Sequence, residues 1–171
     1  SDGDFLDLDW LPHKNRRLVI LTHGLEGNSG GQYIRGMARH FTQHGWDALA
    51  WNCRSCSGEM NRHIRMYHHG DTEDISTVIS HALATGRYDT LVLVGFSMGG
   101  NITMKYLGTH GATAPPEIKA GVAFSSPCDI AAGADVLDRW DNIIYKKRFM
   151  AFLAKKIRHK IFTDVAIENC L

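Results

Sequence analysis

The residues best suited to chemistry lie in the segment Thr90–Asn101, where a serine stands between two glycines. An apolar, β-branched run stops at Gly95, Ser97 follows, and a helical pattern opens at Gly100. This is the G-x-S-x-G pattern between a strand and a helix, a turn that strains the serine backbone and exposes its hydroxyl. Gly95 and Gly99 would keep side chains out of the tight contact there. The pattern predicts that Ser97 is a nucleophile; the alternative is a glycine-rich turn that happens to carry a serine.

A serine nucleophile needs hydrogen-bond donors for the negative charge that forms on the former carbonyl oxygen. Preorganised backbone N–H groups fill this role, and losing one costs on the order of 3 kcal/mol. Met98, the residue after the serine, would supply one donor. Leu25, in the glycine-rich loop His23-Gly24-Leu25, would supply the other, and Gly24 would let the backbone approach the substrate closely. The alternative for this loop is an ordinary connection between a strand and a helix.

The sequence offers no convincing base or acid to complete such a site. A serine hydroxyl is a poor nucleophile until a base takes its proton. His23 is better suited to ordering its loop by hydrogen bonding. In this arrangement the acid and then the histidine follow the nucleophile, which leaves only His110, in a loop, and His159, in a basic helical segment. Asp129 is a geometrically possible acid, or else a helix N-cap or turn residue.

Two of the four cysteines, Cys53 and Cys56, form a C-x-x-C pattern. A zinc site would need a second ligand pair at a suitable spacing, and the sequence has none. A redox C-x-x-C usually opens a helix, whereas the following Ser57-Gly58-Glu59 is typical of a loop. We therefore expect reduced thiols, no metal and no cofactor.

Strands and helices alternate along the chain. Period-two alternation predicts a half-buried strand within residues 5–10, and continuous apolar runs predict buried strands at 17–22 and 90–95. Two further parallel strands are expected at 46–51 and 120–125. Helices are expected at 32–44, from a cap at Asp71 to Gly86, from Gly100 to about Leu107, and through most of the chain after Ala131. This order is typical of an α/β fold with a mostly parallel, doubly wound sheet, whose ligands bind beyond the carboxyl ends of the strands.

The charge and hydropathy of the chain exclude several classes of partner. Its 19 basic and 18 acidic residues leave a formal net charge of +1, which points neither to nucleic acid nor to an anionic membrane surface. No apolar run approaches the roughly 18 residues that a spanning helix needs. No signal peptide is visible, and a cytoplasmic location is the expectation.

Taken together, these motifs resemble the α/β-hydrolase superfamily, and more closely its YheT-like branch, which includes EMB8-type and ABHD1/ABHD3-type hydrolases. The segments that carry the likeness are Asp2–Trp10 (entry strand), His23–Ser29 (oxyanion loop), Asn52–Arg62 and Tyr67–Asp74 (signature loops), Gly95–Asn101 (elbow) and Tyr145–Phe149 (start of the cap helices). Ser55 stands where the branch usually has glycine, and Cys53 adds a C-x-x-C that the branch does not generally use.

The resemblance implies an α/β-hydrolase fold, with residues 1–130 as the N-terminal part of the core and 131–171 as a helical cap segment. It implies a serine carboxylester hydrolase that acts on short- to medium-chain acyl esters or acylglycerols, small-molecule substrates, through an acyl-enzyme at Ser97. Some relatives resemble acyltransferases that use an alcohol instead of water. Members of the branch run on well beyond this length and carry the triad aspartate and histidine there, so a longer protein is expected. The alternative is a catalytically silent module that binds a ligand or partner.

Overall fold

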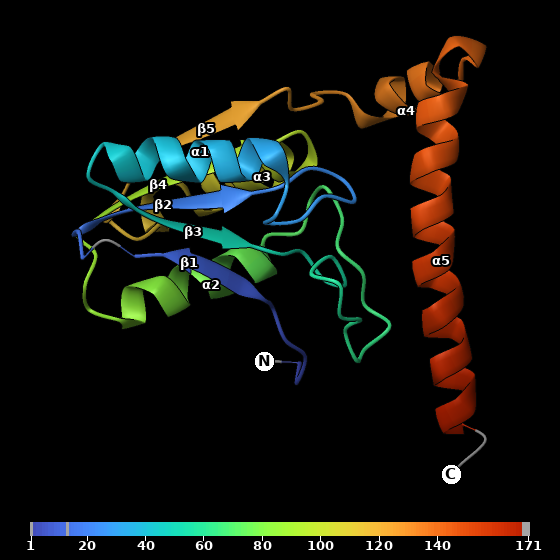
Figure 1. Ribbon diagram of the computed structural model, residues 1–171, viewed down its shortest axis with the longest axis horizontal. Helices are drawn as coiled ribbons and strands as arrows, with labels where there is room; N and C mark the ends of the chain where they lie inside the picture. Colours follow the sequence, from blue (N-terminus) through green and yellow to red (C-terminus); the bar gives the residue numbers. More distant parts are fainter. Residues whose placement is uncertain (1, 13, 169–171) are drawn as a thin grey trace.

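The computed structural model describes residues 2–12 and 14–168, which are built around a five-stranded sheet. The strands are β1 (Leu8–Leu11), β2 (Arg17–Thr22), β3 (Asp47–Trp51), β4 (Thr90–Phe96) and β5 (Ile118–Phe124). They lie in the order β1-β3-β2-β4-β5, with β1 antiparallel to β3 and the other pairs parallel (Figure 1). The four strands predicted as parallel are therefore adjacent and parallel, and the mostly parallel α/β sheet is confirmed; β5, at the edge of the sheet, is largely exposed.

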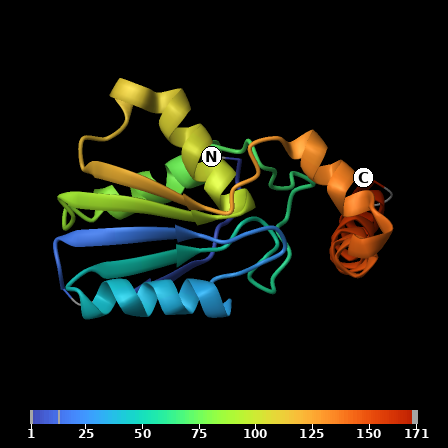
Figure 2. The ribbon, with the colours of Figure 1, turned by 90° about the horizontal axis from the view of Figure 1, so that it is seen from above.

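Helices cover both faces of this sheet. They are α1 (Gln32–Gln43), α2 (Glu73–Ala84), α3 (Met98–His110), α4 (Ile130–Asp138) and α5 (Ile143–Glu168), with short 3-10 turns at Gly111–Thr113 and Trp140–Asn142. Figure 2 shows α1 against one face and α2 and α3 against the other. Val19 and Leu21 of β2 pack in the core under α1, whereas Leu18 and Ile20 pack in the core under α2 and α3. Because alternate side chains of a strand point to opposite faces and both faces are covered, the four central residues of β2, 18–21, are all apolar.

The first strand begins later than the sequence predicts. Residues 5–7 alternate like a strand, but β1 begins at Leu8. The segment before it bends toward the 52–70 loop instead, because the Asp4 carboxylate accepts the Arg62 amide at 3.1 Å and the Phe5 carbonyl accepts the Asn61 side-chain amide at 2.6 Å. Contacts with a segment more than fifty residues away thus override the local pattern.

Two helices start close to their predicted positions but not at them. The predicted cap of α2 at Asp71 is wrong by one residue: the helix begins at Glu73, and its N-cap is Thr72, which forms no side-chain cap bond. Asp71 lies one position before the cap, and its carboxylate accepts the Glu73 amide at 3.2 Å. In contrast, α3 begins at Met98 rather than at Gly100, directly after Ser97, and runs on to His110. The strand and the helix on either side of Ser97 are therefore separated by that single residue.

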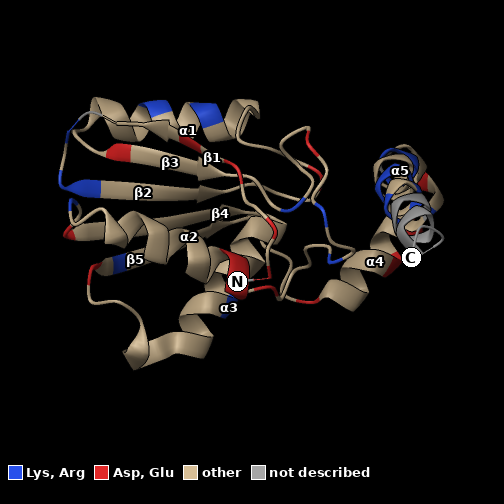
Figure 3. Ribbon diagram, turned by 90° about the horizontal axis from the view of Figure 1, so that it is seen from below, with Lys and Arg blue, Asp and Glu red and all other residues tan. Residues whose placement is uncertain are grey.

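The last two helices lie beyond the carboxyl ends of the parallel strands, with α5 extending past the 52–70 loop (Figure 1). Lysine and arginine residues recur along α5, as the blue parts of its ribbon in Figure 3 show. Much of its surface is exposed, although Lys156 and Lys160 turn toward the rest of the molecule and are largely buried. In the described residues, no helix has both the length and the apolar character required to cross a membrane.

Candidate active site

Ser97 occupies the sharp turn between β4 and α3, at the carboxyl end of its strand. Its backbone has φ 51° and ψ −118°, a sparsely populated conformation that costs a residue with a side chain about 1–3 kcal/mol. Its amide donates to the carbonyl of Phe124 in the neighbouring β5 at 2.8 Å, which ties the turn to the sheet. The residue is exposed, so the strained turn presents it to the solvent side of the sheet.

Two glycines make this turn possible. A Cβ on Gly95 would lie 2.1 Å from the carbonyl oxygen of Gly99, and a Cβ on Gly99 would lie 2.3 Å from the carbonyl oxygen of Thr22. Both obstacles are backbone atoms, which cannot swing aside as a long side chain would. The glycines around Ser97 therefore allow α3 to start directly against the end of β2, and this packing brings the loop after β2 beside Ser97.

The chain after β2 makes a tight turn in contact with Ser97. The Gly27 amide donates to the Gly24 carbonyl at 2.9 Å, so that Leu25 and Glu26 are the central residues of the turn. Glu26 has φ 55°, in the left-handed region that favours glycine. A Cβ on Gly24 would lie 3.3 Å from the Cβ of Ser97, which shows how closely the two segments approach.

Leu25 and Met98, the two residues expected to donate to an oxyanion, both lie next to Ser97 in the fold. Met98 follows Ser97 directly as the first residue of α3, and amides in the first turn of a helix have no acceptor within the helix. Leu25 donates no backbone hydrogen bond within residues 2–12 and 14–168, and it lines the same cavity as Ser97. Both amides therefore lack a partner in the described backbone, and whether they serve an oxyanion is part of the proposal made below.

His23 is fully buried behind the turn. Its Nδ1 donates to the Gly24 carbonyl at 2.7 Å, and its Nε2 accepts the Cys53 amide at 3.0 Å. Because an amide N–H can only donate, Nε2 is the unprotonated nitrogen and the ring is neutral. Burial also lowers the pKa of His23. Both ring nitrogens hold backbone groups, so neither is available to take a proton from Ser97.

Ser97 opens into a cavity of about 300 Å³ with a largely aromatic wall. The lining residues are Gly24, Leu25, Tyr33, Phe96, Ser97, Phe124, Ser125 and Phe149. The Phe96 ring lies between two others, with its centroid 4.9 Å from that of Tyr33 and 5.1 Å from that of Phe124. The Tyr33 hydroxyl also accepts the Gly24 amide at 3.1 Å. Such a wall favours an apolar group bound next to the serine.

The sequence alone does not select the residues of this wall. Phe96 and Phe124 end the adjacent strands β4 and β5, and their place at the carboxyl ends of parallel strands is the signal that could have found them. Ser125 follows directly with φ 51°, a second strained serine at the cavity. Tyr33 comes from α1 and Phe149 from α5, and nothing in their local sequence marks them as neighbours of Ser97.

The acids and bases considered from the sequence lie elsewhere. Asp129 accepts an amide of the first turn of α4 at 2.9 Å and is the N-cap of that helix. His110 ends α3, where its ring lies 4.4 Å from that of Tyr106. His159 lines a separate cavity at α5 and the 60–64 segment. Among the described residues that line the Ser97 cavity there is no histidine, aspartate or glutamate.

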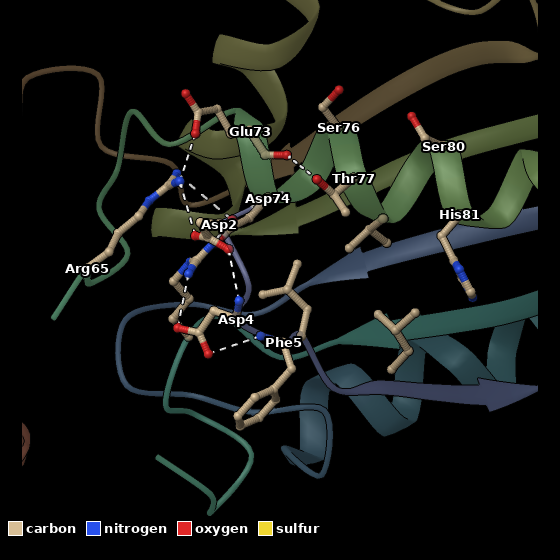
Figure 4. A pocket seen from close by; sticks show the side chains of 14 residues that line it. Asp2, Asp4, Phe5, Arg65, Glu73, Asp74, Ser76, Thr77, Ser80 and His81 are labelled. Atoms are coloured by element: carbon tan, nitrogen blue, oxygen red, sulfur yellow. Dashed lines mark hydrogen bonds and ion pairs between the residues drawn. The ribbon is translucent and has the colours of Figure 1, made fainter. Parts of the chain in front are cut away.

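A larger cavity, of about 650 Å³, lies between the N-terminal segment and α2 and shares no lining residue with the Ser97 cavity (Figure 4). Its charged side chains pair with one another. The Arg54 guanidinium, only 5% exposed, donates twice to Asp74 at 2.7 and 2.8 Å. Arg65 donates to Glu73 at 2.7 Å. These bonds fasten the 52–70 loop to α2.

The C-x-x-C cysteines lie in the same loop. Cys53 and Cys56 are both buried, and neither forms a disulfide. Burial raises the pKa of both thiols, which disfavours the thiolate needed for nucleophilic or redox chemistry. Within the part of the chain that the structure describes, no three histidine, cysteine, aspartate or glutamate side chains are grouped to hold a metal ion.

Comparisons with known proteins agree with this architecture. The family model of the alpha/beta hydrolase fold matches residues 17–155. The chain is 31% identical over 166 residues to the putative esterase YheT of Escherichia coli, which covers 94% of this chain and 48% of that protein. It is also 31% identical over 184 aligned residues to the phospholipase ABHD3 of Bos taurus, covering 100% of this chain and 44% of that protein.

A solved structure shows the same fold. The Pyrococcus furiosus esterase Pf2001 superposes with a TM-score of 0.69 at 21% identity, over 92% of this chain and 58% of that one. The chain spans about half the length of the curated relatives named above. The family model matches most of the residues of this chain, and the sheet order and the glycine-bounded serine turn agree with it. The chain therefore belongs to the α/β-hydrolase family.

Proposed function

We propose that the whole protein is a serine carboxylester hydrolase and that Ser97 is its nucleophile. The observation that carries this proposal is the Ser97 turn itself: a strained, exposed serine faces an apolar cavity that Leu25 also lines. Strain of this kind persists where the surrounding structure holds it, and it is concentrated at functional sites. The names of the relatives, an esterase and a phospholipase, support ester hydrolysis.

In the proposed reaction, the Ser97 Oγ attacks the carbonyl carbon of the ester while a base takes the hydroxyl proton. The negative charge on the carbonyl oxygen accepts hydrogen bonds from the Leu25 and Met98 amides, the proposed oxyanion donors. The C–O bond then breaks, the alcohol leaves with the proton, and the acyl group remains on Ser97. Attack by water releases the acid. His23 and Gly24 support the turn, the first by its hydrogen bonds and the second by its close approach to Ser97.

The proposed substrates are short- to medium-chain acyl esters or acylglycerols. A cavity of about 300 Å³ with a wall of aromatic rings suits an acyl chain of limited length. Phe149 of α5 belongs to this wall, so residues 131–171 would act as the start of a cap over the site. An alcohol acyltransferase would share the acyl-enzyme and differ only in the acceptor; product partitioning to an added alcohol would reveal it.

A second candidate is a catalytically silent binding module. The observation that favours it is the lack of any histidine, aspartate or glutamate among the described residues at the Ser97 cavity. Because the chain spans about half the length of its relatives, we propose that the remainder of the whole protein supplies the base and its acid partner. The 171-residue chain alone would then bind an ester but hydrolyse it poorly, since Ser97 would stay protonated.

A fluorophosphonate probe separates these candidates, because it reacts with an activated serine hydroxyl. We expect the whole protein to be labelled at Ser97, the Ser97→Ala variant to be unlabelled, and the 171-residue chain to react far more slowly. Ser57→Ala, at an exposed serine away from the cavity, is the matched control and should leave labelling unchanged. A whole protein that is not labelled at Ser97 would contradict the hydrolase and favour the binding module.

A further inference from the structure

A buried ion pair joins α5 to the turn after β2, across a separation of 130 residues. The Lys156 Nζ lies 3.0 Å from each carboxylate oxygen of Glu26, and the two side chains are only 13% and 5% exposed. We propose that Lys156 is a positioning residue: by pairing with Glu26 it holds the turn in the conformation that presents the Leu25 amide to Ser97. The catalytic meaning of this pairing rests on the function proposed above.

Both members of the pair have further partners. The Tyr67 hydroxyl donates to the Glu26 carboxylate, and the Glu26 amide donates to the same hydroxyl oxygen at 3.3 Å. The Lys156 ammonium also lies 3.2 Å from the Cys56 sulfur and 5.3 Å from the centre of the Tyr67 ring. Burial raises the pKa of Cys56, so its thiol is neutral and Glu26 is the anion that balances Lys156. The cluster therefore joins three segments of the chain.

The backbone conformation of Glu26 explains why its ion pair with Lys156 would affect the position of the Leu25 amide. Glu26 has φ 55°, which a residue with a side chain adopts only when its surroundings stabilise it. Its carboxylate is held by Lys156 and Tyr67, and Leu25 is its neighbour in the same turn. If the carboxylate loses its cation, a buried charge remains unpaired, and the turn can relieve this by moving toward solvent. The Leu25 amide would move with it.

The same helix also builds the wall of the cavity. Phe149 lies seven residues before Lys156, two turns away on the same face of α5. One turn beyond Lys156, Lys160 donates to the carbonyls of Asn61 and His63. A single placement of α5 thus sets both the aromatic wall and the turn that carries Leu25. A change in the position of this helix would affect the binding of the acyl chain and the stabilisation of the oxyanion together.

The test compares four variants of the whole protein: Lys156→Met, Lys156→Arg, Lys155→Met and the double variant Glu26→Gln/Lys156→Met. Lys155 is the exposed neighbour of Lys156 on the same helix and serves as the matched control. Two readouts are taken. The first is kcat and KM for p-nitrophenyl butyrate, and the second is hydrogen exchange of the peptide that contains residues 23–31, which needs no catalysis.

We expect Lys156→Met to lower kcat by about 10- to 100-fold with KM changed by less than about threefold, since an oxyanion donor acts in the transition state. Exchange in residues 23–31 should quicken. Lys156→Arg should retain most of the activity, because it keeps the charge. The double variant should be less impaired than Lys156→Met, because it leaves no buried carboxylate unpaired. Lys155→Met should behave like the unmodified protein.

Equal kcat and equal exchange in Lys156→Met and Lys155→Met would overturn the proposal. So would a double variant more impaired than Lys156→Met, since the unpaired charge would then not be the cause. If Lys156→Met does not fold, Glu26→Gln, which removes the same ion pair from its other side, is compared with Lys155→Met by the same readouts, and equality again overturns it. Activity that survives Ser97→Ala would refute the proposed function, whereas the exchange of residues 23–31 would still decide whether the ion pair holds the turn.

Discussion

Replacing Ser97 with glycine should make the protein more stable than replacing it with alanine. Both changes remove the hydroxyl, so their difference isolates the backbone. Alanine at φ 51° and ψ −118° keeps a strain of about 1–3 kcal/mol, and glycine relieves it. Glycine also loses more conformational freedom on folding, by roughly 0.5–1 kcal/mol. The net expectation is that Ser97→Gly is more stable than Ser97→Ala by about 0.5–2 kcal/mol.

Urea unfolding and thermal unfolding of the two variants measure this difference; about 1 kcal/mol corresponds to about 2–4 °C in Tm for a chain of this size. The control is the same pair of changes at Ser80, an exposed position inside α2, where glycine should be less stable than alanine by about 1 kcal/mol. The sign of the difference should therefore invert between the two sites. If glycine is the less stable residue at Ser97 as well, the turn is not strained and the structural basis for an activated serine fails.

Four further changes test the packing and the buried charges of the fold. Gly99→Ala should destabilise the fold by about 1–3 kcal/mol or more in urea unfolding, because its Cβ meets backbone oxygens, whereas Gly36→Ala in α1 meets nothing within 4 Å and should stabilise it by about 1 kcal/mol. Arg54→Met should cost about 3–5 kcal/mol by the same measurement, since it removes both hydrogen bonds to the buried Asp74 carboxylate and leaves it only Arg65, at 3.9 Å, as a cation. Burial raises the pKa of Asp4, but hydrogen bonds from one side-chain amide and three backbone amides outweigh it and lower the pKa to about 2. The stability that Asp4 contributes should be present at neutral pH and be lost as the pH falls from about 4 to about 2, and Asp4→Asn should flatten that part of the pH–stability curve.

The central sheet and the serine turn could be predicted because their causes are local. Strands covered on both faces are apolar along their centres, and residues 18–21 of β2 and 91–94 of β4 show this directly. The glycines around Ser97 are required by backbone atoms a few residues away or at the end of β2, so the pattern itself carries the geometry. The close approach of the loop after β2 to the serine turn could be predicted for the same reason, since Gly24 must pass close to Ser97.

The rest of the site depends on contacts between distant segments, which local patterns do not record. Phe149 lines the cavity, and Lys156 pairs with Glu26, only because α5 lies beside the loops at the carboxyl ends of the strands. As a sequence feature, Lys156 is one of several lysines in a basic helix, and nothing distinguishes it from its exposed neighbour Lys155. The late start of β1 has the same origin, because Asp4 is held by residues near position 62.

The most direct measurement of the proposed function is the fate of the acyl group when the whole protein reacts with p-nitrophenyl butyrate. Rapid quenching followed by peptide mass spectrometry should find butyrate esterified to the peptide that contains Ser97, together with a burst of p-nitrophenol. The Ser97→Ala variant should show neither, and the 171-residue chain should show little of either. Turnover that persists in Ser97→Ala, or a butyryl group on a peptide without Ser97, would contradict the assignment of Ser97 as the nucleophile.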